Sequence, residues 1–117
     1  MNFKVTATPN GKGKVKITVT NPDGTSWVYA EKAKEGRFTH YAVVTQEITQ
    51  AAIDRHISFE KRHWNGCSVD RPYLEGLIGE SCSFIQMATK ESTAKKAGPC
   101  LPYAEAKSVE VFEVEAA

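Results

Sequence analysis

The chain has 117 residues, of which 41% are hydrophobic and 25% are charged, and its formal net charge is +1. This length favours one domain with its own core, residues 1–117, and this composition argues against a disordered chain. The near-zero net charge excludes a molecule that is drawn as a whole to nucleic acid or to anionic lipid.

The sequence also argues against a membrane partner. No apolar run approaches the roughly twenty residues that a spanning helix needs, and the first residues lack the apolar core of a secretion signal. We therefore expect a cytoplasmic location. The chain has three cysteines, an odd number that cannot form a complete disulfide framework, so we expect reduced, partly buried thiols.

The first forty-four residues are predicted to form β-strands, because apolar residues alternate there with Lys and Thr. A period of two places every second side chain on the same sheet face. Turn sequences at residues 9–13, 21–24 and 35–36, rich in Gly, Asn and Pro, separate the strands. The sequence therefore predicts a four-stranded antiparallel meander, whose strands cover residues 3–8, 14–20, 26–31 and 38–44.

The apolar period changes at about Thr45, where three- and four-residue spacings predict an amphipathic helix. Either Thr45 or Thr49 could cap its start, and Asn65-Gly66 is expected to end it. A short helix is predicted to open at residues 70–72, because Asp suits the cap and Pro the first turn. Its expected apolar stripe consists of Leu74, Leu77 and Ile78.

The last third of the chain is harder to interpret. Residues 81–97 fit a helix, which we prefer, although residues 82–88 alone could form a strand. Residues 108–114 predict a strand whose alternation slips between Val111 and Phe112. The glutamates of this strand are expected to lie beside the lysine-bearing first strands. Together these elements predict an α+β fold, in which two to three helices pack on one face of an antiparallel sheet made of the meander plus the C-terminal strand.

One set of side chains has the chemistry of a closed zinc site. The paired C-x2-C spacing of recognisable zinc modules is absent, so core thiols and a surface histidine are the competing interpretation. No other cofactor is indicated, and zinc has only these candidate ligands. A thiol nucleophile activated by a nearby histidine is a further alternative. The candidate zinc ligands are His63, Cys67, Cys82 and Cys100.

Two surface hypotheses remain. Aromatic side chains on the two predicted central strands could form a protein-binding surface if the helices cover the other face, or they could be the core layer. The lysines of the first hairpin could track a nucleic-acid backbone, or they could be solvated, paired with Glu, or protecting an edge strand. The candidate protein-binding residues are Trp27, Tyr29, His40 and Tyr41, and the candidate nucleic-acid-binding residues are Lys4, Lys12, Lys14 and Lys16.

Trp27-x-Tyr29, followed by residues 38–44, resembles small uncharacterised proteins encoded by actinobacterial phages, which often open with a Lys/Thr-rich hairpin. The likeness covers residues 3–44. It implies a compact accessory protein that acts inside a host cell, in the host cytoplasm, and it supplies no catalytic residues.

The sequence contains no complete catalytic set, although it does not decide whether the chain is an enzyme. We therefore expect a non-enzymatic α+β module that binds another protein, such as a host factor. Nucleic-acid binding through the hairpin lysines is the first alternative, and a zinc- or thiol-dependent protein is the second. A homodimer is left open.

Overall fold

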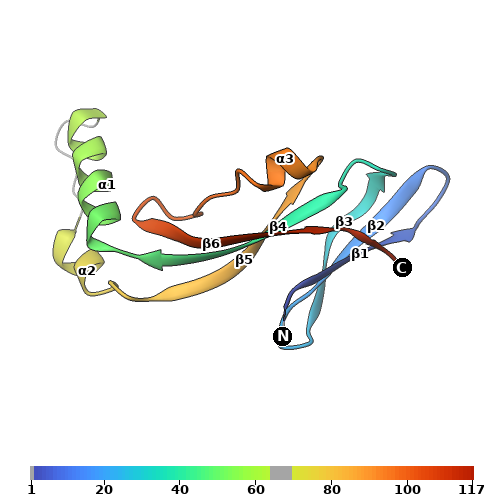
Figure 1. The fold of residues 1–117 in the computed structure, drawn as a ribbon, viewed down its shortest axis with the longest axis horizontal. Coiled ribbons are helices and arrows are strands. Elements are labelled where there is room, and N and C mark those ends of the chain that lie inside the picture. The colour runs from blue at the N-terminus through green and yellow to red at the C-terminus, as the bar shows by residue number, and fades with distance from the viewer. Residues whose placement is uncertain (1, 64–69) are drawn as a thin grey trace. The chain divides into compact units, whose positions relative to one another are not determined.

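The computed structural model describes residues 2–63 and 70–117, without the side chains of residues 60–63. Within these ranges the chain forms seven strands and three helices, which confirms the predicted α+β class (Figure 1). The strands are β1 (Lys4–Pro9), β2 (Lys14–Thr20), β3 (Ser26–Lys34), β4 (His40–Ile48), β5 (Ser81–Ala88), β6 (Ala104–Glu113) and β7 (Glu115–Ala116). The helices are α1 (Gln50–His63), α2 (Arg71–Glu75) and α3 (Glu91–Ala94).

The strands form two sheets, in the orders β3-β2-β1-β7 and β5-β4-β6. The predicted hairpins β1–β2 and β2–β3 are confirmed as antiparallel pairs. The placement of the fourth strand in the same meander is wrong, because β4 is the middle strand of the second sheet. Its four consecutive residues 41–44 are all buried, so both of its faces are covered, as they are for a strand inside a layered core.

The predicted C-terminal strand, residues 108–114, coincides with the end of β6, and β7 follows it. Strand β6 lies beside β4, and only the short β7 pairs with β1, in parallel. Glu115, just after the predicted strand, lies beside the first strand, with its carboxylate oxygen 3.6 Å from Lys4 Nζ. The glutamates inside the predicted strand, Glu110 and Glu113, belong to β6, which lies beside β4 and not beside the first strands. Val111 and Phe112 are both half-buried, in agreement with the predicted slip in alternation.

The chain divides into two compact units, each described here by itself. The first unit consists of Met1–Val43, Ile85–Ala97 and Glu110–Ala117, and the second of Val44–Phe84 and Gly98–Val109.

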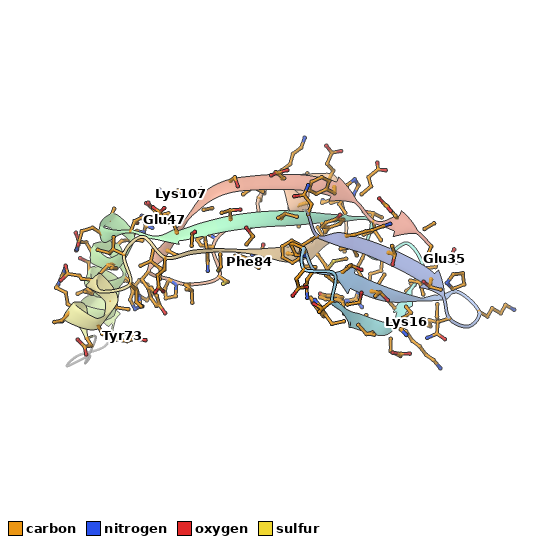
Figure 2. The ribbon with its side chains drawn as sticks, turned by 90° about the horizontal axis from the view of Figure 1, so that it is seen from below. Lys16, Glu35, Glu47, Tyr73, Phe84 and Lys107 are labelled. Carbon is orange, nitrogen blue, oxygen red and sulfur yellow. The ribbon has the colours of Figure 1, made fainter. Side chains whose placement is uncertain are left out.

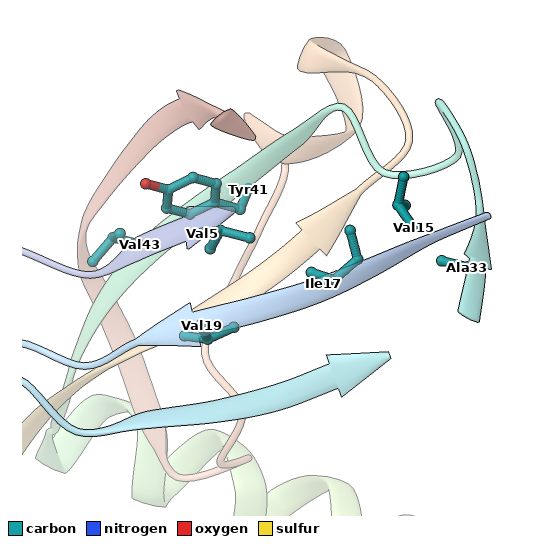
Figure 3. Packing of buried hydrophobic residues seen from close by; sticks show 7 residues of the cluster. All are labelled: Val5, Val15, Ile17, Val19, Ala33, Tyr41 and Val43. Carbon is teal, nitrogen blue, oxygen red and sulfur yellow. The ribbon is translucent and has the colours of Figure 1, made fainter. Parts of the chain in front are cut away.

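The core of the first unit lies against the inner face of the sheet β1–β3 (Figure 3). Val5, Ile17 and Val19 are at most 1% exposed there, as their alternation with Lys and Thr predicts. We expected helices to cover this face, but strand residues do so. They are Tyr41 and Val43 of β4, Ile85 and Met87 of β5, and Phe112 and Val114 near the end of the chain.

The core of the second unit joins α1, α2 and the ends of β4 and β6. Helix α1 begins five residues later than Thr45, which is part of β4. Thr49 is the residue that caps it, since its Oγ1 accepts the Ala52 N–H at 3.2 Å. Ile53 and Ile57 of α1 then pack with Leu74 of α2. The predicted helix end at Asn65-Gly66 lies outside the described residues. The buried residues of this core are Ile48, Ile53, Ile57, Leu74 and Ala104.

Asp70 caps α2 as predicted, since its carboxylate accepts the Tyr73 N–H at 3.1 Å. Of the expected apolar stripe, Leu74 is buried and Leu77 half-buried, whereas Ile78 is exposed. Arg71 donates a hydrogen bond of 2.8 Å to Asp54 of α1, and this bond lowers the pKa of the Asp54 carboxyl. Among the described residues, no helix has the length and apolarity to cross a bilayer.

The preference for helix over residues 81–97 is wrong for most of this segment. Residues 81–88 form β5, and only residues 91–94 are helical, as α3. The difference is explained by β5 lying beside β4 in the second sheet. Directly before β5, Gly79 donates to the carbonyl of Ile48 and Ile48 donates to that of Glu80, both at 3.0 Å. These long-range bonds outweigh the weak local helix preference of a segment that contains Cys and Ser.

Candidate functional site

The strongest candidate site is a row of side chains along β3, an edge strand of the first sheet. Trp27 and Tyr29 are 42% and 43% exposed, and their ring centroids lie 6.3 Å apart. The Tyr29 ring meets Phe38 edge to face at 5.4 Å, and the Arg37 guanidinium lies over Phe38, 5.1 Å from the ring centroid. We call these four residues, Trp27, Tyr29, Phe38 and Arg37, the aromatic row.

The turn before β3 holds the first member of the row in place. Asn21 accepts the indole N–H of Trp27 at 3.0 Å, and the same side chain donates to Thr25. Thr25 donates its hydroxyl to Asp23 at 2.6 Å and its N–H to the same carboxylate at 2.9 Å, and these bonds lower the pKa of Asp23. This exposed tryptophan is therefore tied to an ordered turn.

Strand irregularity explains why these rings gather at the edge. Trp27 lies opposite Val19, but the register of β2 against β3 shifts by one residue between Ile17 and Thr18, at the level of Tyr29. A bulge of this kind turns a strand and redirects its side chains. Phe38 packs against the core of the first unit, so the row is anchored at that end.

The four predicted protein-binding residues do not form one surface. Tyr41 is only 4% exposed, stacks on Phe112 at 5.4 Å and donates to the Phe3 carbonyl at 3.3 Å, so it belongs to the core. His40 is half-buried, and its Nδ1 lies 2.8 Å from Thr39 Oγ1. It lines a shallow depression with Glu91 and Lys95, which form an ion pair. Sequence reasoning did not include Arg37 and Phe38 in the site, because nothing in the pattern indicated that a turn residue and a core-facing ring would lie beside Tyr29.

Two of the hairpin lysines, Lys14 and Lys16, lie on the outer face of the sheet β1–β3, whereas Trp27 lies opposite Val19 of the inner face. Lys14 and Lys16 alternate with the buried Val15 and Ile17, and Lys16 can be followed in Figure 2. Lys4 is paired with Glu115, and Lys12 is in the turn between β1 and β2. The sequence missed two further lysines on β3, Lys32 and Lys34, which flank the buried Ala33 and therefore face outward. We call Lys14, Lys16, Lys32 and Lys34 the lysine face.

The zinc hypothesis can be followed for two of its four residues. Cys82 and Cys100 are free, exposed thiols, not the partly buried ones expected, and both contact Gln46 in the second unit. The side chain of His63 and all of Cys67 lie outside the described residues. Within the described residues no group of three or more metal-ligating side chains is assembled. For the thiol-nucleophile alternative, the polar side chain that contacts both thiols is the Gln46 amide, which cannot act as a base.

Comparison with protein-family models finds no match to this chain, and comparisons with curated proteins and with solved structures find no significant match. The features of the described residues that bear on function are therefore the aromatic row, the lysine face and the two thiols Cys82 and Cys100.

Proposed function

We propose that the chain is a non-enzymatic binding module whose aromatic row docks on another protein. The observation that carries this proposal is the simultaneous exposure and ordering of Trp27 and Tyr29. Each residue is more than two-fifths exposed, yet each ring contacts its aromatic neighbours, and the Trp27 indole also forms a hydrogen bond. Ordered exposed rings lose little conformational entropy on binding.

The residue types of the row support the same conclusion. Trp, Tyr and Arg are the residues most enriched among side chains that dominate binding energy at protein interfaces. Single exposed apolar residues are common on any surface, but here an aromatic pair continues into Phe38 and Arg37. The row therefore offers an apolar centre with a cation at one end.

This arrangement specifies the chemistry of the partner. Arg37 forms no ion pair with any residue in the described part of the chain, so its charge is available to a ligand. A partner that places an apolar side chain on Trp27 and Tyr29 and a carboxylate beside Arg37 would satisfy the whole row. The resemblance to phage proteins suggests a host factor as this partner, with the host cytoplasm as the place of action.

The test is a comparison of three variants in pull-downs from nuclease-treated host lysate. A defined protein, identified by mass spectrometry, should be retained by the wild-type chain and by Tyr73→Ala, since Tyr73 is a 63% exposed aromatic outside the row. The double variant Trp27→Ala/Tyr29→Ala should lose that protein, because a hot-spot truncation weakens binding by about thirtyfold or more. Arg37→Glu should weaken it as well. Equal retention by all variants, or no protein retained at any salt concentration, would refute the proposal.

Nucleic-acid binding is a second candidate, and the lysine face is the observation that favours it. Lys14 and Lys34 lie directly opposite each other on β2 and β3, and no described residue forms an ion pair with any of the four lysines. Four uncompensated cations on one sheet face resemble a surface that tracks a phosphate backbone. Among the described residues of β2 and β3, those paired on this face include Val28 and threonines and no aromatic residue, so they supply no stacking platform of the kind common in such sites.

The second candidate has its own test. The triple variant Lys14→Ala/Lys16→Ala/Lys34→Ala should bind single-stranded DNA more weakly and with a flatter salt dependence than the wild-type chain. Lys4→Ala is the matched control, because Lys4 is already paired with Glu115. Unchanged affinity in the triple variant would exclude this function, whatever the outcome for the aromatic row.

A further inference from the structure

Two thiols distant in sequence converge on one buried amide in the second unit. Gln46 Nε2 lies 3.4 Å from Cys82 Sγ and 3.3 Å from Cys100 Sγ. Cys82 is in β5, and Cys100 is in the segment between α3 and β6. Since both sulfurs contact the same nitrogen atom, their separation cannot exceed the sum of these two distances.

The orientation of the Gln46 amide is fixed by a backbone group. The Cys100 N–H donates to Gln46 Oε1 at 3.0 Å, and a backbone N–H can only donate. The carbonyl end of the amide is therefore assigned, and its NH2 end must face the sulfurs. Because an NH2 group can only donate, both sulfurs act as acceptors and direct lone pairs toward the same atom, Gln46 Nε2. Gln46 is 2% exposed, so this arrangement is a built feature of the interior.

The two cysteines are exposed residues, although the Gln46 side chain that contacts both sulfurs is buried. Cys82 also lines a pocket of about 130 Å³, together with Glu80, Ser81 and Leu101. A small reagent can therefore reach Cys82, whereas structural cysteines are ordinarily buried and inert.

We propose that Cys82 and Cys100 form a redox-active dithiol, which a low-molecular-weight disulfide such as oxidised glutathione converts into an intramolecular disulfide. This proposal is independent of the aromatic row and of the lysine face. It assigns a modification site to the second unit.

The exchange proceeds in two balanced steps. The Cys82 thiolate attacks one sulfur of the small disulfide, its S–S bond breaks, and one small thiolate leaves, giving a mixed disulfide on Cys82. The Cys100 thiolate then attacks the Cys82 sulfur, and the second small thiolate leaves. The two protein thiols lose two electrons in total, the small disulfide gains them, and the two thiol protons pass to the released thiolates.

The proximity of Cys100 determines what should be observed. A neighbouring thiol resolves the mixed disulfide intramolecularly, so that adduct should be short-lived in the wild-type chain. Removing Cys100 should leave glutathione on Cys82. Cys67 supplies a matched control, since it is a third thiol of the same chain with no assigned part in the pair.

The experiment incubates the folded chain with oxidised glutathione over a range of glutathione redox poise, followed by alkylation, intact mass measurement and peptide mapping. The wild-type chain and Cys67→Ser should lose two hydrogen masses and give a Cys82–Cys100 cross-linked peptide. Cys100→Ser should accumulate the glutathione adduct on Cys82 at about tenfold or more the wild-type level. Gln46→Leu, checked for folding by circular dichroism, should form the cross-link more slowly or at an altered poise, because the sulfurs lose their common partner.

Three results would overturn the proposal. They are a wild-type chain whose Cys82 and Cys100 remain alkylatable at every poise, a cross-link that requires Cys67, and equal glutathione adducts on wild type and Cys100→Ser. Because Cys82 and Cys100 are exposed, their serine variants should fold, and a near-native thermal melt of each variant confirms this before the chemistry is scored.

Discussion

Lys34 of β3 lies directly opposite Lys14 of β2, so two like charges share a cross-strand pair on an exposed sheet face. Like charges in this position destabilise a sheet, whereas opposite charges contribute roughly 0.2–1 kcal/mol. Keeping such a pair lowers the stability of the fold, and proteins often accept lower stability at positions that serve function.

Lys34→Glu should therefore raise the free energy of unfolding by about 0.5 kcal/mol, because it replaces repulsion with attraction. Lys34→Gln, which only removes the repulsion, should give a smaller increase. Urea denaturation at low salt measures both variants, and about 1 M NaCl should remove most of the gain through screening. A decrease in stability, or a gain that salt leaves unchanged, would show that the two ammonium groups do not interact.

The core of the first unit should be sensitive to truncation of its inner face. Ile17 is 1% exposed, so Ile17→Ala should lower the free energy of unfolding by about 2–5 kcal/mol through lost burial and the cavity left behind. Val28 is 43% exposed on the neighbouring strand, and Val28→Ala should change it by less than about 0.5 kcal/mol. Similar losses for the two variants would contradict the assignment of inner and outer faces.

The cap of α1 should be measurable separately. Thr49 Oγ1 accepts the Ala52 N–H, and its hydroxyl donates to Glu105 of β6 at 3.0 Å. Thr49→Ala should cost about 1 kcal/mol or more, because the helix loses a cap and Glu105 loses a donor. Thr49→Ser keeps the oxygen and should retain most of that stability. Thermal unfolding followed by far-UV circular dichroism distinguishes the two variants.

Tyr41 predicts how stability depends on alkaline pH. Burial of the phenol, with a smaller effect of the Glu115 charge, raises its pKa above the model-compound value of 10.0. The unfolded chain therefore releases this proton at a lower pH than the folded chain does. The contribution of Tyr41 is fully present below pH 10.0 and is lost as pH rises through the folded pKa.

Tyr41→Phe removes this ionisation and should flatten the alkaline loss of stability relative to the wild-type chain. Near neutral pH the variant should cost about 1 kcal/mol for the lost hydrogen bond to Phe3, while the ring keeps its stacking on Phe112. Denaturation curves collected from pH 8 upward compare the two proteins. Parallel pH profiles would mean that the Tyr41 hydroxyl is not the responsible group.

The sequence predicted the first two hairpins well, because the information for them is local. Alternation of Val15, Ile17 and Val19 with polar residues sets the face, and the turns at residues 9–13 and 21–24 set the connections. The position of β4 was not predicted, because it depends on distant segments of the chain that cover both faces of this strand. The run of apolar residues 41–44 did indicate that both faces are covered, since it departs from strict alternation.

The two sites were less predictable for a different reason. The aromatic row arises from a register shift near Tyr29 that brings residues of β3 beside the later Phe38 and Arg37. The thiol pair depends on Gln46, a residue of β4 that lies beyond the predicted strand 38–44, where the sequence predicted the start of a helix. Neither arrangement follows from spacing: the row depends on an irregular strand register, and the thiol pair on side chains from segments far apart in the chain.

The parallel pairing of β7 with β1 has a consequence for how the chain acquires its structure. Thr6 meets Glu115, and Ala117 donates its N–H to the carbonyl of Ala7 at 3.0 Å. During synthesis, the edge of β1 that pairs with β7 therefore keeps its backbone groups unpaired until almost all of the described polypeptide has left the ribosome. Loop closure over such a separation is slow, so chaperone capture of nascent chains is expected to concentrate on this first strand.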